Sequence, residues 1–289
     1  MLSTLQSVDL PSGTIHYRVV GPLDGVPVVL VHGFLVDHSL WADVPERLAG
    51  AGYRCYAPTW PLGSHTTAMT AGADLSPRGV ARVVLSFLVA LELSDVVLVG
   101  SDTGGAICQF VLDEDASRVS RLVLTNCDAF ETFPPFPFDL LFRLVRHPRA
   151  ARAALQTMRV GRLRTSKLGF GWLAHRRLSP EESLGWVTPY LTDAGVRRDV
   201  AAFARGWSAA DLEDVATRLP SFDRPVLLVW GSRDRFFTID LARRLLDVFP
   251  DARLVELDDA LTFVALDQPA RLAEEIVQLG GWGRIASAP

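Results

Sequence analysis

The feature that most constrains this sequence is the stretch 97–106, Val-Leu-Val-Gly-Ser-Asp-Thr-Gly-Gly-Ala. Its apolar beginning predicts a buried strand and the residues after it predict a helix, so the chain must turn sharply between the two. Glycines on either side of the turn let the backbones approach closely, and the central residue, Asp102, is held exposed at the end of the strand. The sequence therefore requires a fold in which buried strands lead directly into helices.

Most of the chain alternates short β-rich runs with helical ones, which is typical of a doubly wound α/β sheet. Strands are predicted at 14–20, 28–31, 53–56, 95–100, 121–125, 226–230 and 253–257, and helices at 40–50, 76–93, after 104–105, at 240–248 and from 268. Between about residues 130 and 215 only helical patterning is found, together with many aromatic residues. We therefore predict an α/β core of residues 1–129 and 216–289, with a helical cap inserted at 130–215.

Composition and charge narrow the class of protein. Apolar residues make up 49% and charged residues 21% of the 289 residues, the balance of a soluble protein with a substantial core. The formal net charge of -4 provides no basic footprint for nucleic acid. Neither a membrane-spanning apolar run nor a signal-peptide pattern is found, so we expect a cytoplasmic protein that binds neither nucleic acid nor a membrane. The sequence contains no metal-ligand spacing or nucleotide-binding motif, and we predict no cofactor.

Asp102 has two competing interpretations. Ser101 is a commoner kind of nucleophile but lies one place outside the Gly-x-nucleophile-x-Gly register. Asp102 itself is also a common residue for capping a helix that starts with glycines. Two other predicted strand ends favour the nucleophile, because His32-Gly33 follows one strand and the sequence Gly-Ser-Arg-Asp, ending at Asp234, follows another.

Together these motifs resemble the α/β-hydrolase superfamily over nearly the whole chain, and within it the aspartate-nucleophile branch of haloalkane dehalogenases and epoxide hydrolases. The resemblance implies an α/β-hydrolase fold, with a mostly parallel central sheet, helices on both faces and an inserted helical cap. It implies that Asp102 is the nucleophile, that the backbone N–H groups of Phe34 and Thr103 form the oxyanion hole, and that Asp234 is the acid.

The catalytic histidine of that family is missing. It belongs in the loop after the strand ending at Leu257, where residues 258–264 read Asp-Asp-Ala-Leu-Thr-Phe-Val, and Thr262 occupies its place. No histidine lies beyond His175. In the two-step scheme a carboxylate attacks carbon to form an alkyl ester, and the histidine then activates water against that ester. Either another group activates water here, or the chemistry is not hydrolysis.

Groups that assist the leaving atom also differ from the family pattern. Haloalkane dehalogenases tend to carry Trp after the nucleophile and Asn or another donor after His-Gly, whereas this chain has Thr103 and Phe34. Epoxide hydrolases of this branch use a pair of cap tyrosines, and Tyr190 is the only tyrosine between residues 130 and 215. The resemblance therefore assigns no residues of this chain to the stabilisation of a departing halide or of an oxirane oxygen.

Several other side chains are weighed as substitutes for the histidine. His38 and His65 fall in segments near the predicted mouth of the site, although local packing or capping explains each more simply. His32 is normally structural in this family. Asp258 and Asp259, beside the vacant place, are alternative carboxylate bases, with solvation in a loop as the simpler interpretation.

Asp234 needs a role if no histidine faces it. A buried carboxylate close to Asp102 would raise one pKa of the pair and create a proton-sharing acid and base. The simpler alternative is an ion pair with Arg233 or Arg235. Asp128, just after the strand that ends near residue 127, is a second place where some dehalogenases carry the acid.

The ligand site is expected to be apolar and aromatic, because aromatic residues cluster at strand ends and in the predicted cap. Core packing is the competing interpretation for each of them. The predicted pocket residues are Trp41, Phe130, Trp207, Phe237, Thr262 and Phe263, with Phe34, Trp60 and Phe236 as further aromatic candidates.

The segment 143–167 is strongly basic. It contains seven arginines and the only lysine of the chain, Lys167, and no acidic residue. The simpler interpretation is a solvated helix face. The functional one is a docking surface for an anionic carrier or a coenzyme A-linked partner.

Three functions follow from these observations. The leading one is an enzyme of hydrolase type that acts on a hydrophobic small molecule with Asp102 as nucleophile or general base. The second is a cyclase, lyase or isomerase of secondary metabolism in which Asp102 and Asp234 move protons and no ester forms. The third is a ligand-binding protein that has kept the pocket and lost turnover.

Overall fold

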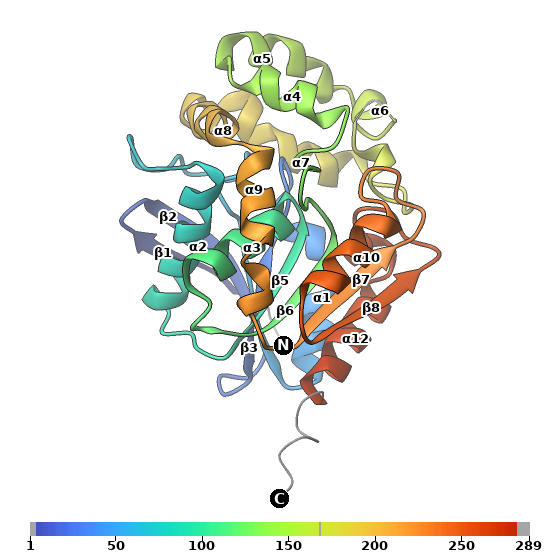
Figure 1. Ribbon diagram of the computed structural model, residues 1–289. Coiled ribbons are helices and arrows are strands. Elements are labelled where there is room, and N and C mark those ends of the chain that lie inside the picture. Colours follow the sequence, from blue (N-terminus) through green and yellow to red (C-terminus); the bar gives the residue numbers. More distant parts are fainter. Residues whose placement is uncertain (1–3, 168, 282–289) are drawn as a thin grey trace, which may run out of the picture.

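The computed structural model describes residues 4–167 and 169–281. Its centre is an eight-stranded sheet in the order β1-β2-β4-β3-β5-β6-β7-β8 (Figure 1). The strands are β1 (Thr4–Leu10), β2 (Gly13–Val20), β3 (Val26–Val31), β4 (Tyr53–Pro58), β5 (Val96–Asp102), β6 (Val119–Cys127), β7 (Val226–Gly231) and β8 (Ala252–Leu257). The β1/β2 and β2/β4 pairs are antiparallel, and the other pairs are parallel. The predicted α/β-hydrolase fold with a mostly parallel sheet is confirmed.

Helices cover both faces of this sheet, as buried parallel strands require. One face is covered by α2, α3, α9 and α10, and the other by α1 and α12. Their bounds are α1 (Val44–Gly50), α2 (Pro77–Ala90), α3 (Thr103–Asp115), α9 (Ala209–Ala216), α10 (Ile239–Val248), α11 (Val264–Asp267) and α12 (Pro269–Gly281). None of the helices in the described ranges is long and apolar enough to cross a membrane.

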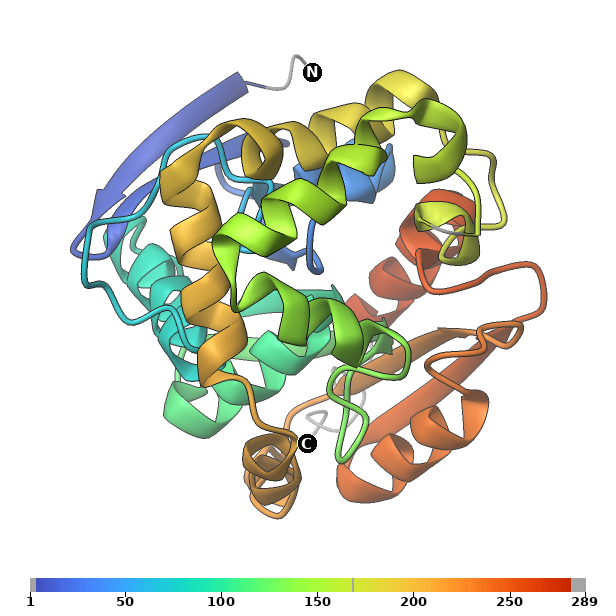
Figure 2. The same cartoon turned by 90° about the horizontal axis from the view of Figure 1, so that it is seen from above.

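A separate layer of helices lies over the carboxyl edge of the sheet, and Figure 2 shows this layer from above. It consists of α4 (Phe138–Val145), α5 (Pro148–Leu155), α6 (Gly161–Arg164), α7 (Pro180–Thr192) and α8 (Ala194–Gly206). Short 3-10 turns complete the chain at His38–Trp41, Gln156–Arg159, Phe170–Trp172 and Leu219–Ser221. Helix α9 packs against α3 beside the sheet, so the upper layer ends near Gly206, before the predicted cap boundary at 215.

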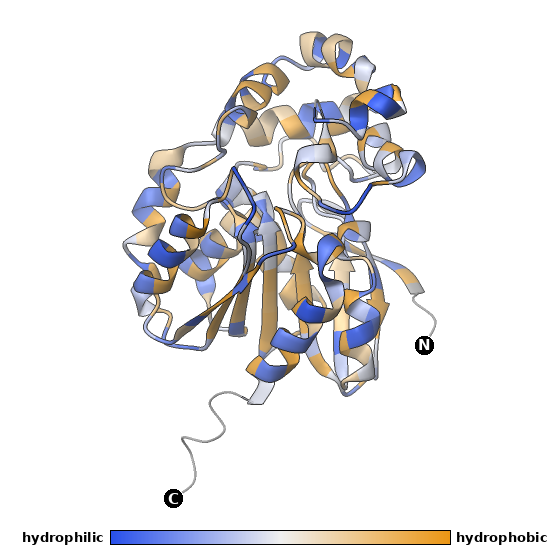
Figure 3. Ribbon diagram, turned by 90° about the vertical axis from the view of Figure 1, so that its right-hand side faces the viewer, coloured by the Kyte–Doolittle hydropathy of each residue, from blue (hydrophilic) through white to orange (hydrophobic). Residues whose placement is uncertain are grey.

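The apolar core has two layers because successive side chains of a strand point to opposite faces. In β3, Val29 and Val31 join the cluster under α2 and α3, whereas Val28 and Leu30 join the cluster under α1 and α12. The central strands are accordingly hydrophobic along their length, and the helices that cover them are amphipathic (Figure 3). This packing holds the carboxyl ends of β3, β5, β6 and β7 at one edge of the sheet.

Two local predictions differ from the structure. The strand β1 was not predicted, because its alternating sequence TLQSVDL lies at the sheet edge and carries little apolar signal. The predicted helix 40–50 is instead a 3-10 turn followed by α1, with Ala42 at a φ of 47° between them. Pro45 lies in the first turn of α1, where its missing N–H costs nothing, and the helix begins there rather than earlier.

Candidate active site

Asp102 occupies the junction between β5 and α3. Its backbone has a φ of 55° and a ψ of -134°, a conformation that non-glycine residues rarely adopt. Close neighbours must be glycines: a Cβ on Gly33 would lie 1.9 Å from the Asp102 Oδ2, and one on Gly104 would lie 2.1 Å from the Val31 carbonyl oxygen. The Asp102 side chain makes no capping hydrogen bond to α3. The strained turn thus places the carboxylate at the start of α3 without the usual side-chain cap of that helix.

The Asp102 carboxylate is bound by a backbone donor from the neighbouring strand end. The Phe34 N–H donates to Asp102 Oδ2 at 3.1 Å. Burial raises the pKa of Asp102 to about 7, the Phe34 and Thr103 N–H groups oppose that rise, and the charge of Asp234 adds to it. These two N–H groups are the pair expected to form the oxyanion hole, so the site presents a carboxylate whose protonation changes near neutral pH.

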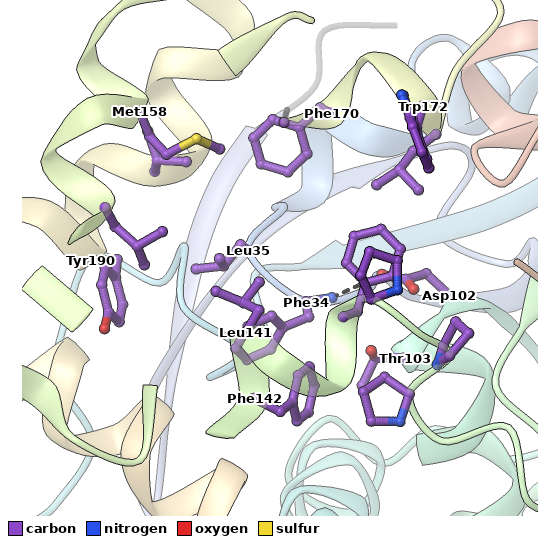
Figure 4. A pocket seen from close by; sticks show the side chains of 18 of the residues that line it. Phe34, Leu35, Asp102, Thr103, Leu141, Phe142, Met158, Phe170, Trp172 and Tyr190 are labelled. Atoms are coloured by element: carbon purple, nitrogen blue, oxygen red, sulfur yellow. Dashed lines mark hydrogen bonds between the residues drawn. The ribbon is translucent and has the colours of Figure 1, made fainter. Parts of the chain in front are cut away.

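The carboxylate opens into a cavity of about 430 Å³ between the sheet and the helical layer above it (Figure 4). Asp102 is the one acidic residue and Lys167 the one basic residue among the described residues that line it. The other lining residues are Phe34, Leu35, Thr103, Pro134, Pro135, Pro137, Phe138, Leu141, Phe142, Leu155, Met158, Gly169, Phe170, Trp172, Leu173, Val187, Tyr190 and Leu191. The volume and the apolar walls suit a small hydrophobic molecule.

The six side chains predicted as substrate pocket lie outside this set of lining residues. Trp41 packs in the core layer under α1 and α12, on the other side of the sheet. Phe130 lies against the Arg244 guanidinium, 4.3 Å from the guanidinium carbon to the ring centre. Trp207 packs beneath Phe142, a wall residue of the cavity. These positions fit the competing interpretation of core packing.

Of the remaining three predicted pocket residues, two contact Asp234 and one packs against a helix of the upper layer. The Phe237 N–H donates to Asp234 Oδ1 at 3.3 Å, and the ring of Phe263 packs edge-on against Trp186. Thr262 is fully buried, and its hydroxyl donates to Asp234 Oδ2 at 2.8 Å. The place of the family histidine is thus filled by a side chain that serves the acid and does not reach the cavity.

Asp234 is held by four donors. Asn126 Nδ2 and the Thr262 hydroxyl donate to Oδ2, and the N–H groups of Phe236 and Phe237 donate to Oδ1. Burial raises the pKa of Asp234 to about 6 against these hydrogen bonds. The nearby Arg233 pairs with Asp259 instead, at 3.3 Å. Asp234 is therefore a hydrogen-bonded buried carboxylate, and neither arginine alternative describes its surroundings.

A second buried carboxylate, Asp128, lies directly after the residue of β6 that pairs with Asp102. Both of its carboxyl oxygens are buried and have no hydrogen-bond partner among the described residues. Burial, and next the charge of Asp102, raise the pKa of Asp128 well above its usual range. A neutral Asp128 is the form that such a site stabilises at neutral pH.

The candidate histidines have structural partners elsewhere. The Trp60 N–H donates to His32 Nε2 at 2.8 Å, and burial lowers the pKa of His32 to about 4. His65 lies 3.3 Å from Asp199 of α8, and His38 lies 2.9 Å from the Thr59 hydroxyl. None of these three rings is among the described residues that line the cavity.

Two further alternatives are also placed by the structure. Ser101 is buried, and its hydroxyl has no hydrogen-bond partner within the described ranges. It is not one of the lining residues, in keeping with its place outside the nucleophile register. Asp258 and Asp259 are exposed loop residues that contact Ser232 and Arg233.

Sequence reasoning missed most of the cavity wall. The walls come from the segment 134–142 and from Leu155, Met158, Phe170, Trp172 and Leu173. A signal was present for part of it, because the run Phe-Pro-Pro-Phe-Pro-Phe at 133–138 combines aromatic residues with prolines that exclude regular helix. For Met158 and Leu173 no local pattern distinguishes a cavity wall from ordinary core.

A parallel α/β sheet that carries an aspartate on a strained strand-to-helix turn, under a layer of helices, defines an enzyme of the α/β-hydrolase class. The family model for the alpha/beta hydrolase fold matches residues 26–269. The chain belongs to this family.

Individual relatives agree with this assignment. Haloalkane dehalogenase 2 of Mycobacterium tuberculosis is 31% identical over 278 residues, covering 94% of this chain and 93% of the relative. A cis-3-alkyl-4-alkyloxetan-2-one decarboxylase of Xanthomonas campestris is 27% identical, covering 89% of both chains. The crystal structure of a haloalkane dehalogenase from Bradyrhizobium elkani superposes with a TM-score of 0.79 at 17% identity, covering 97% of this chain and 98% of that chain. The chain is therefore a hydrolase-like enzyme of this fold.

Proposed function

We propose that the protein transforms a hydrophobic small molecule with the Asp102 carboxylate as its nucleophile. The observation that carries this proposal is the position of Asp102, which is the one acidic residue among the described lining residues of an apolar cavity. Its strained backbone and the Phe34 N–H aim the carboxylate at that cavity. Such preorganisation is what a covalent carboxylate nucleophile needs.

The expected first step is attack of an Asp102 oxygen on an electrophilic carbon. A carbon–oxygen bond forms, the bond from carbon to the leaving group breaks, and the leaving group departs with the electron pair. The carbonyl oxygen of the resulting alkyl ester stays within reach of the Phe34 N–H. Lining donors that face a leaving oxygen or halide are restricted to Thr103, Tyr190, Trp172 and Lys167.

The second step of a hydrolase, attack of water on the ester, has no assigned base in this site. The Thr262 hydroxyl donates to Asp234, and neither residue lines the cavity. A missing base slows such a step by about 10²- to 10⁴-fold. We therefore infer that the Asp102 ester, once formed, is released slowly by water.

The same observation favours a second candidate function, a non-hydrolytic reaction in which Asp102 acts as a base or is expelled without water. A pKa of about 7 is well matched to proton transfer at neutral pH. The Xanthomonas relative, named as an oxetan-2-one decarboxylase, supports this class because loss of carbon dioxide requires no water. Asp234 would act in this scheme as the second member of an acid and base pair.

The test is intact-protein mass spectrometry after incubation with 1-bromohexane, 1,2-epoxyhexane and a 3,4-dialkyl oxetan-2-one, with Asp102→Asn as the matched variant. A mass increase mapped to Asp102 in the native protein and absent from the variant supports the nucleophile. Absence of both adduct and turnover with all three probes contradicts it and favours the ligand-binding interpretation.

Incubation in ¹⁸O-water separates the two candidate reactions. A hydrolytic reaction places solvent oxygen in the product or in Asp102. A non-hydrolytic reaction consumes substrate without incorporating it. Either outcome assigns the reaction class, provided that Asp102→Asn abolishes the conversion.

A further inference from the structure

Lys167 combines two properties that no other described residue of the cavity shares. It is the only lysine of the chain, and it is the only exposed residue among the described residues that line the cavity. A residue that lines the cavity and is also exposed to bulk solvent lies where the two meet. Lys167 therefore marks the mouth of the cavity.

The turn that carries Lys167 is tightly constructed. Gly169 N–H donates to the Ser166 carbonyl oxygen at 3.0 Å, which closes the turn after α6. A Cβ on Gly169 would lie 2.2 Å from the Arg164 carbonyl oxygen, so a larger residue would displace the turn. The next residues, Phe170 and Trp172, form part of the cavity wall. Lys167 therefore precedes two wall residues closely in the sequence and lies next to a turn that requires glycine at residue 169.

The segment of the chain that leads to Lys167 is positively charged. Arg149, Arg152, Arg159 and Arg162 of the segment 143–167 are exposed and form no ion pair with the described residues. The remaining arginines of this segment have structural partners, because Arg143 pairs with Asp139, Arg146 binds the Ala204 carbonyl oxygen and Arg164 is buried against Met158, Pro180 and Ser183. These exposed arginines give the segment 143–167 an excess of positive charge that attracts anions.

The two charges of the cavity lie on different layers of the molecule. Asp102 is the last residue of β5 at the sheet edge, and Lys167 follows α6, a helix of the upper layer, in the chain. The walls between them are apolar. A ligand with an anionic end is attracted by Lys167 and repelled by Asp102, so the charges specify its orientation as well as its class.

We propose that the substrate is an anionic amphiphile, a hydrophobic molecule whose carboxylate or phosphate end binds Lys167 while its body carries the reacting carbon to Asp102. This inference rests on the proposed function in taking this cavity as the substrate site. It adds the charge and the orientation of the substrate. A free acid and an acyl chain linked to coenzyme A both present this chemistry.

The test measures binding without reaction, through the fluorescence of the tryptophans, one of which, Trp172, lines the cavity. The probes are decanoate, 1-decanol and decyltrimethylammonium, which share one chain and differ in charge. We expect the native protein to bind decanoate about tenfold more tightly than 1-decanol, a difference of about 1.4 kcal/mol. Lys167→Gln should abolish this preference, and Lys167→Arg should retain it. Binding of 1-decanol should be the same in all three proteins.

The matched control is Arg152→Gln, which removes one exposed positive charge from the segment 143–167 at a residue outside the lining of the cavity. It should leave the preference for decanoate unchanged at 0.15 M salt, because exposed charges beyond about 8 Å are largely screened there. Equal binding of decanoate and 1-decanol by the native protein, or a preference that survives in Lys167→Gln, overturns the proposal. These binding results are independent of whether Asp102 forms an ester, so the two proposals fail separately.

A chemical measurement checks the position of the lysine. Because Lys167 carries the only lysine amine of the chain, acetylation by an N-hydroxysuccinimide ester modifies one side chain besides the N-terminus. Decanoate should slow acetylation of Lys167 and leave the N-terminus unaffected, whereas 1-decanol should protect less. Equal protection by both ligands would contradict an anion at this amine.

Decanoyl-coenzyme A distinguishes the two sources of the anion. Tighter binding of the thioester than of decanoate, weakened by the double change Arg159→Gln and Arg162→Gln, assigns a carrier-linked substrate. Binding of decanoate alone assigns a free acid.

Discussion

Two ends of the site differ in how their carboxylates are held. At the elbow, Asp102 has a strained backbone, its carboxylate accepts a hydrogen bond from the Phe34 N–H, and it faces an open cavity. At the other end, Asp234 is enclosed by four donors and has no access to that cavity. An under-coordinated carboxylate on a strained turn is arranged for reaction, whereas a fully coordinated one is arranged for stability.

The largest expected effect is that of Asp102→Asn. The amide is a poor nucleophile and a poor base, so adduct formation or turnover should fall by about 10³-fold or more. The folded protein should not lose stability, since an amide avoids the unfavourable ionisation of a buried carboxyl. Ser101→Ala is the matched control and should react like the native protein. Full loss of reaction in Ser101→Ala would transfer the nucleophile to the serine.

The comparison is sharpened next by Thr262→His, which restores the family's pattern at the Asp234 end. If the vacant base is what limits ester release, breakdown of the Asp102 ester should accelerate by about 10²-fold or more, measured as loss of the adduct mass over time. Because Thr262 is fully buried, the larger ring is expected to lower stability by about 1–3 kcal/mol. A folded variant whose ester decays at the native rate would show that the site lacks room for a bound water.

The pH dependence should distinguish the elbow carboxylate. Reaction requires ionised Asp102, so the rate should rise about tenfold per pH unit below pH 7 and level off above it. Stability should change in the opposite direction. The folded state retains a proton that the unfolded chain releases near pH 4, so the free energy of unfolding falls as pH rises from about 4 to about 7.

The matched variant for this pH test is Asp102→Asn, in which the fall in stability should be smaller, because only the buried carboxyls Asp128 and Asp234 then contribute. Denaturant unfolding at several pH values measures it. An adduct rate that is flat from pH 5 to pH 8 would contradict a pKa near 7 at the nucleophile.

The smallest expected effect on activity is that of Asp234→Asn. The new amide nitrogen faces either the Asn126 amide or the backbone N–H groups, so donors oppose donors and about 1–3 kcal/mol of stability should be lost. Adduct formation should change by about threefold or less, because Asp234 does not line the cavity. A loss of about 10²-fold or more in a stably folded variant would instead support the paired acid and base of the non-hydrolytic scheme.

The sequence predicted the fold and the elbow because both depend on local patterns. Apolar runs that end in glycine, such as 97–100, identify buried strands wherever they occur. The strained conformation of Asp102 was also predictable, since residues 100–105 supply small neighbours on both sides. The same local reasoning failed for β1. This edge strand is not buried on both faces, and no distinctive turn motif marks it.

The cavity was far less predictable than the sheet. An aromatic residue such as Trp41 looks the same in sequence whether it lines a pocket or packs under α1, because the choice depends on which distant segments it meets. Helix starts in the upper layer are set by Pro148 and Pro180, but the relative placement of these helices depends on contacts with one another. The cavity lining therefore depends on how the fold places lining residues from 134–142 and 155–191 above the carboxyl end of β5.

What the sequence by itself determined is the mostly parallel α/β fold and the place of Asp102 on the turn between a strand and a helix, since each follows from residue types at fixed short spacings. Tertiary structure alone decided that Thr262 binds Asp234 away from the cavity, that Asp128 is fully buried and that Lys167 lies at the mouth. These properties arise from burial and from contacts between residues far apart in the chain. Local preferences of the backbone carry no information about such contacts, so they become visible only when the chain is folded.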